Sequence, residues 1–234
     1  METNRFILAR HIGVDALMCF TVAFMGFKSR AIMKDMIDAG LRRRPNTMPE
    51  AGYETRMFTY HPEAQRILLF FFAYQVKNLY DSWAWEDGAI FIAHHIMAMS
   101  AAWGGMHPGV SHFYAGFFMG TSEVSTGVLC LLANFDDEFG VKGLGEAFPV
   151  LRAALAGTFT VLFIIFRCII WPFVAYHFLR DTRSALKGKS EKAEGRRVWM
   201  RVIAYTCAGL SVLQVLWLWE IIEIGQKELA ILRS

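Results

Sequence analysis

The sequence has few of the residues that build disulfide frameworks, zinc sites or irregular loops. Of its 234 residues, only 4 are cysteines and 6 are prolines. No two cysteines form a CxxC pair, which argues against a zinc ribbon or a thiol redox motif. All four cysteines lie in apolar segments, and we interpret them as small buried residues.

Motifs of several enzyme classes are also missing. The 7 histidines show neither the HxxxH nor the HxxHH spacing of membrane di-iron enzymes, so we expect no metal site. The chain has no GxSxG nucleophile elbow and no glycine-rich phosphate-binding loop. Apart from two basic loops, nothing favours nucleic-acid binding, and we expect no nucleic-acid partner.

Charge is scarce, and apolar residues are abundant. Charged residues make up 19% of the chain and apolar residues 55%. This composition is typical of a multi-pass membrane protein. The sequence therefore predicts an all-α, polytopic transmembrane helix bundle that forms a single domain over residues 1–234. Six segments come close to the roughly 20 residues that a bilayer core requires, and they are 7–27, 64–80, 88–104, 111–133, 154–179 and 198–224.

The charges between these segments alternate in sign. Segments 28–66 and 180–197 are rich in Lys and Arg, whereas 81–87 and 134–153 have an excess of Asp and Glu. With six spans, both basic segments fall on one side, which the positive-inside rule places in the cytoplasm, and both termini fall on the other. The three consecutive arginines at 42–44 either contact anionic lipid headgroups or only fix the orientation.

Ionisable residues inside the predicted spans are the main candidates for function, because a charge at membrane depth is costly unless it is paired or faces a cavity. His94 and His95 are adjacent in the third span, and Glu123 lies in the fourth. Helix neighbours point about 100° apart, so the two imidazoles face different partners. A neutral imidazole can act as a base or nucleophile near pH 7. Alternatively, one or both histidines only form hydrogen bonds between helices and take no part in chemistry.

Glu123 lies on a face of small residues. Gly116, Gly120, Glu123 and Gly127 follow helical spacing, and such a face allows another helix to approach closely. Arg167, the only charged residue of the apolar segment 163–169, is a candidate partner for Glu123. The acid then serves as an interhelical tie to an arginine or a histidine, as a proton-handling group in a lipid reaction, or as a contact for a lipid headgroup.

The end of the second span carries a further polar set. Tyr74, Asn78 and Asp81 share one helix face at positions i, i+4 and i+7. Lys77 and Asp81 are four residues apart and can form an ion pair.

These residues, in this order, resemble the TLC domain, the membrane domain shared by ceramide synthases and several small lipid-regulating proteins. The resemblance rests on Tyr74…Asn78…Asp81, His94-His95, Glu123-Val124-Ser125-Thr126 and Phe166-Arg167…Pro172. It implies a bundle of six to seven helices that encloses a lipid-sized cavity, with a role in lipid synthesis, sensing or transport. The endoplasmic reticulum is the usual membrane of the family, and another organelle membrane is the alternative.

The resemblance also suggests roles for individual residues. The candidate catalytic residues are His94, His95 and Glu123, and the candidate lipid-binding or pocket residues are Tyr74, Asn78, Asp81, Ser122 and Arg167. One departure matters. Ceramide synthases follow their histidine pair, one helix later, with a His-Asp…Asp pattern, whereas this chain has Ser122-Glu123 there.

Three functions remain open at this point. The first is a protein that binds lipid or acyl chains and affects membrane lipid composition, which requires a cavity near the polar side chains. The second is an N-acyltransferase resembling ceramide synthase, with acyl-CoA as substrate and a lipid amine as acceptor. The third is a structural subunit of a larger membrane protein complex. We expect no tightly bound cofactor in any of the three.

Overall fold

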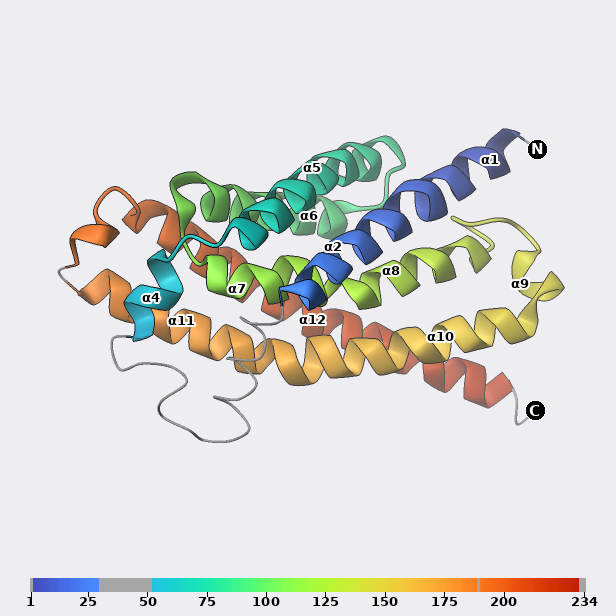
Figure 1. Cartoon of the computed structure of the whole chain (residues 1–234). Coiled ribbons are helices and arrows are strands. Elements are labelled where there is room, and N and C mark those ends of the chain that lie inside the picture. Colours follow the sequence, from blue (N-terminus) through green and yellow to red (C-terminus); the bar gives the residue numbers. More distant parts are fainter. Residues whose placement is uncertain (1, 30–51, 189, 232–234) are drawn as a thin grey trace.

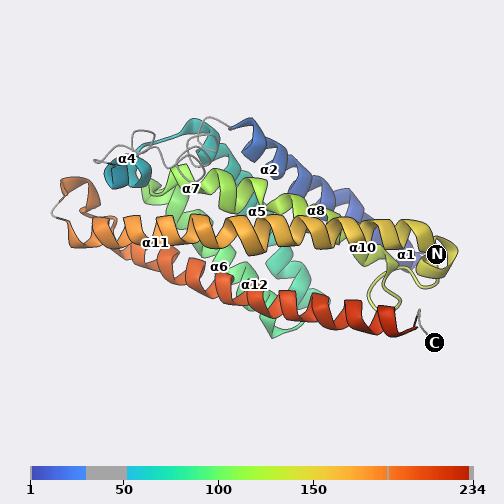
Figure 2. The ribbon, with the colours of Figure 1, turned by 90° about the horizontal axis from the view of Figure 1, so that it is seen from below.

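The computed structural model describes residues 2–29, 52–188 and 190–231, and these residues are helical or in turns, with no strand among them. The long helices lie side by side in one elongated bundle (Figure 1, and from below in Figure 2). The predicted helical class is confirmed. The three arginines at 42–44 lie outside the described residues.

Each predicted span corresponds to a long helical segment, and several contain a π-helical turn. The first three segments are α1 (Glu2–Leu8), η1 (Ala9–Ala16) and α2 (Leu17–Lys28), then α5 (Pro62–Ala84), then α6 (Ala89–Gly104) with η3 (Gly105–Gly109). The last three are α7 (His112–Gly116), η4 (Phe117–Thr121) and α8 (Glu123–Leu132), then α10 (Pro149–Phe163), η6 (Ile164–Ile170) and α11 (Trp171–Lys187), then α12 (Arg197–Ile231). The short elements are α4 (Gly52–Phe58), η5 (Ala133–Phe135), α9 (Leu144–Ala147) and η7 (Glu191–Ala193).

Five of these segments are long and apolar enough to cross a membrane. They are Asn4–Lys28, Ala89–Gly109, His112–Phe135, Pro149–Lys187 and Arg197–Lys227. The remaining predicted span, α5, is a continuous helix of 23 residues but is more polar. Gln75, Lys77 and Asp81 in its second half account for much of this polarity, and all three contact polar partners.

The connections gather at the two ends of the bundle according to their charge. The α5–α6 turn and the segment around α9 lie at the same end as the start of α1 and the end of α12 (Figure 1). The segment between α11 and α12, which is rich in Lys and Arg, lies with α4 at the opposite end. This arrangement agrees with the alternation of charge in the sequence.

The N-terminal helix packs against the small-residue face predicted around Glu123. A Cβ atom added to Gly26 of α2 would lie 2.4 Å from the backbone nitrogen of Thr121 and 2.7 Å from the carbonyl oxygen of Gly116. A Cβ atom added to Gly120 would lie 3.0 Å from the Cα of Gly26. The predicted close approach of a helix to this face is therefore confirmed, and the approaching helix is α2.

Candidate functional site

The structure joins Glu123 and Arg167 across two helices. Nη2 of Arg167 donates a hydrogen bond to Oε1 of Glu123 at 2.7 Å. The Arg167 side chain is 8% exposed and the Glu123 side chain 7%. The same nitrogen donates to Thr126 Oγ1 at 3.0 Å, and the guanidinium lies 5.3 Å from the ring centre of Trp171. The negative charge of Glu123 is therefore compensated by the positive charge of Arg167 inside the bundle, as a buried charge requires.

This ion pair continues into a chain of polar contacts on neighbouring helices. Cys19 of α2 lies with its thiol 3.9 Å from Glu123 Oε2 and donates to the Tyr74 hydroxyl at 3.2 Å. All of these side chains are buried. The predicted pocket residue Tyr74 thus belongs to the same polar network as Glu123. The link between them is Cys19, which the sequence indicates only as a small buried residue.

The two histidines have different surroundings, as the angle between helix neighbours predicts. His95 Nδ1 forms a hydrogen bond with Gln75 Oε1 of α5 at 2.7 Å. The His94 ring lies against Trp217 of α12, with 5.2 Å between ring centres. The Nδ1 atom of His94 is buried and has no hydrogen-bond partner in the part of the chain that the structure describes.

A second polar network lies at the end of the bundle that holds the α5–α6 turn. Arg10 contacts Asp87 at 2.5 Å and Asp81 at 3.7 Å, and Lys77 contacts Asp81 at 2.6 Å. Lys77 also forms a close ion pair with Asp15. The predicted pair of Lys77 and Asp81 is confirmed. Asp81 therefore ties η1 to α5 through Arg10.

Helix distortions coincide with these charged groups. Arg10 and Asp15 lie in the π turn η1, Arg167 lies in the π turn η6, and Glu123 follows η4 after one residue. A π turn changes the direction in which side chains leave a helix, and such turns are frequent at functional sites. Four of the charged side chains that form the polar networks therefore lie in or next to a π turn.

An apolar cavity of about 50 Å³ lies further along the bundle. Its lining is contributed by α5, α6 with η3, α7 with η4, α11 and α12, and includes Leu68, Ala98, Tyr114, Trp171, Phe178 and Leu210. None of the eight candidate site residues lines it. The cavity nevertheless lies one helical turn from several of them. For example, Ala98 follows His94 by four residues and Trp171 follows Arg167 by four.

The remaining candidate residues have simpler environments. The Ser122 hydroxyl donates to the carbonyl of Phe118 in the preceding turn, which is an ordinary contact of a serine within a helix. Asn78 is half-buried on α5. Within the described ranges, no three metal-ligating side chains lie close enough to hold an ion.

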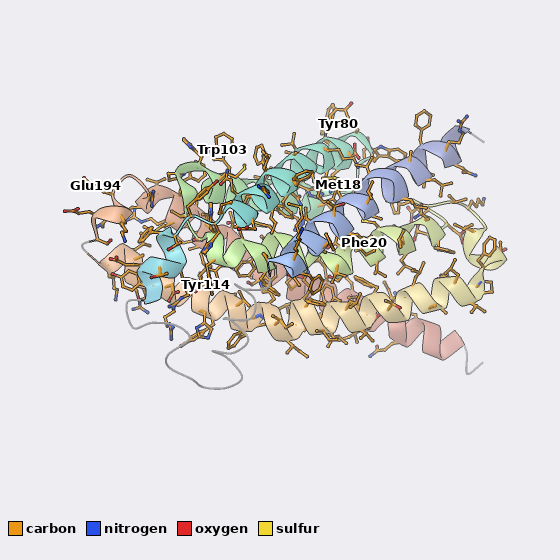
Figure 3. The ribbon with its side chains drawn as sticks, viewed as in Figure 1. Met18, Phe20, Tyr80, Trp103, Tyr114 and Glu194 are labelled. Atoms are coloured by element: carbon orange, nitrogen blue, oxygen red, sulfur yellow. The ribbon has the colours of Figure 1, made fainter. Side chains whose placement is uncertain are left out.

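Sequence reasoning missed a third buried network, at the basic end of the bundle. Arg56 of α4 forms two hydrogen bonds with Asp181 of α11, which also accepts one from the Tyr114 hydroxyl at 2.6 Å. Burial works against the charge of Arg56 but the Asp181 contact outweighs it, so the pKa of Arg56 is raised. Figure 3 shows Tyr114 within the bundle, whereas Tyr80 points away from it. Arg56 and Asp181 both lie in basic segments, and in the sequence the charges of these segments indicate only membrane orientation or contact with lipid headgroups.

Comparison with family models matches residues 6–223 to the family described as TLC domain. The chain belongs to the TLC-domain family. The match includes every candidate site residue and extends over nearly the whole chain, so the resemblance drawn from the motifs is confirmed. Together with the five apolar helices, it identifies an integral membrane protein. Searches of curated proteins and of solved structures gave no significant match.

Proposed function

We propose that this TLC-domain protein binds an acylated membrane lipid within its helix bundle and thereby affects membrane lipid composition. The supporting observation is the apolar cavity one helical turn from His94 and Arg167. An apolar cavity beside buried polar side chains suits a molecule that has a chain and a polar group. Membrane lipids are accordingly the proposed ligands, and the endoplasmic reticulum is the proposed location.

The size of the cavity sets a condition on binding. Its volume of about 50 Å³ has room for only a few waters, since one water needs about 10–15 Å³ of such space, and is far too small for an acyl chain. A bound chain must therefore move the lining side chains or helices apart. Helix α6 and the adjoining η3 contribute only small residues to the lining, namely Ala98, Ala101 and Gly105.

Selectivity in this scheme comes from polar contacts. The bilayer interior is as apolar as the cavity, so a chain gains little from transfer between the two. Hydrogen bonds to the polar part of the lipid then decide which lipid is retained. His94, with its unpartnered nitrogen, is the side chain best suited to make one.

Acyl transfer is the second candidate function, and the unpartnered Nδ1 of His94 favours it. In this reaction Nδ1 accepts a proton from a lipid amine while the amine nitrogen attacks the thioester carbonyl of acyl-CoA. The C–S bond then breaks, and the proton passes to the departing thiolate, giving N-acylated lipid and CoA. Glu123 and His95 already contact Arg167 and Gln75, so we assign them positioning roles in this reaction.

The experiment compares the lipids of cells that lack the protein with those of cells rescued by variants. Rescue uses wild type, the double variant His94→Ala/His95→Ala, or the control His107→Ala, which changes an exposed histidine of η3. We expect the wild type and the control to restore the lipid profile and the double variant to fail while still accumulating in the membrane.

Two further results separate the candidates. Formation of N-acylated product by purified protein, given acyl-CoA and a lipid amine, supports the transferase. Co-purification of lipid without turnover supports binding alone. A lipid profile that deletion leaves unchanged contradicts both functions and favours a structural subunit.

A further inference from the structure

The amide of Gln214 is buried in α12 without a partner. The residue is 4% exposed, and neither Nε2 nor Oε1 has a hydrogen-bond partner among the residues that the structure describes. Buried polar groups are normally hydrogen-bonded, and an unpaired amide at membrane depth is costly. A residue of this kind therefore points to a group that binds there.

Gln214 lies at the level of His94. Helix α12 runs antiparallel to α6, since a Cβ atom on Gly209 would lie 2.6 Å from Met97 Sδ and the Trp217 ring lies 5.2 Å from the His94 ring. Gln214 falls between Gly209 and Trp217 on the same helix. Two buried polar groups without partners, the Gln214 amide and His94 Nδ1, thus occur at neighbouring levels of two packed helices.

The helix faces that carry Gln214 and His94 also contribute residues to the lining of the apolar cavity. Cys207 and Leu210 line it, and Gln214 follows them by seven and four residues, which places all three on one face of α12. On α6, Ala98 lines the cavity and follows His94 by four residues. The unpartnered polar groups therefore lie at one end of the cavity, toward the α5–α6 turn.

We propose that Gln214 and His94 form the polar end of the lipid site, with the acyl chain of the ligand extending into the cavity. This assignment rests on the proposed function. Gln214 offers an unpaired donor and an unpaired acceptor, so the matching lipid carries an uncharged group that both donates and accepts, either a hydroxyl or a secondary amide. A charged headgroup is disfavoured because the nearby Arg167 is already neutralised by Glu123.

The test uses the full-length protein in detergent with N-methylpalmitamide and methyl palmitate, two probes of equal chain length. Only the amide has an N–H that can donate to the Gln214 oxygen. We expect the wild type to bind the amide about tenfold more tightly, as one buried hydrogen bond permits. The variant Gln214→Met should bind both probes alike, and Gln226→Met, which changes an exposed glutamine of the same helix, should keep the preference.

Thermal unfolding without lipid provides a second measurement. Gln214→Met should melt no lower than wild type, because it removes a buried amide that has no partner. A lower melting temperature would mean that the amide is already paired within the fold and would overturn the proposal. Equal binding of both probes by wild type would also overturn it while leaving lipid binding intact, whereas failure of wild type to bind either probe or any co-purified lipid would count against the proposed function itself.

Discussion

Removing one partner of the ion pair between Glu123 and Arg167 should destabilise the protein strongly. The N–O distance is 2.7 Å and both side chains are less than a tenth exposed, so neither charge can reach water when its partner is lost. Truncating one partner of a buried pair costs about 3–5 kcal/mol, because the other charge stays buried without compensation. We therefore expect Glu123→Met and Arg167→Met each to lower the unfolding free energy by about this amount.

The double variant separates charge pairing from packing. Replacing both partners by apolar residues of similar volume is often neutral or stabilising, so Glu123→Met/Arg167→Met should recover much of the loss. The measurement is reversible unfolding in mixed micelles, analysed as a double-mutant cycle. The control is the pair of Lys192, which is exposed, and Glu54, which is half-buried, 3.8 Å apart. This pair should contribute at most about 1 kcal/mol. Additive losses for the two buried substitutions would refute the reasoning.

Two further predictions follow from packing and from the basic end of the bundle. Gly26→Ala should destabilise the protein by about 1–3 kcal/mol, since its Cβ would meet the Thr121 backbone at 2.4 Å. Gly157→Ala, with nothing within 4 Å of its Cβ, should stabilise by up to about 1 kcal/mol. Equal effects of these two changes in chemical unfolding would contradict the close helix approach. Tyr114→Phe removes a hydrogen bond to the Asp181 carboxylate and should cost about 1.5–3 kcal/mol, and an unchanged melting temperature would show that this bond contributes nothing.

Sequence reasoning recovered the helical segments because long apolar runs and the spacing of small residues are local properties. It also named Arg167 as a partner for Glu123, because a lone charge in an apolar run needs one. The same criterion, applied to neutral polar residues, would have singled out Gln75 and Gln214. The position and the shape of the cavity depend on how helices that are far apart in the sequence pack together. No local pattern in the sequence encodes this packing.

The pairing of Asp181 with Arg56 escaped notice for a different reason. Both residues lie in segments with many charges, and most of those charges that the structure describes are exposed. Sequence alone does not tell which of them are buried. Only the fold of α4 back onto α11 and α7 removes this pair from water. The π turns are similarly hidden, because no single residue type specifies them.

The tryptophans near one end of α12 indicate how deep the candidate lipid site lies in the membrane. The 35 residues of α12 extend about 52 Å at 1.5 Å per residue, well beyond a hydrocarbon core of about 30 Å. Trp217 and Trp219 lie in its second half, and Trp85 lies in the turn at the same end of the bundle. Tryptophan favours the boundary between chains and headgroups, and the His94 ring meets the Trp217 ring edge to face. If a lipid binds as proposed, its linkage region would therefore reach the level of His94 after only a small displacement from its ordinary position in one leaflet.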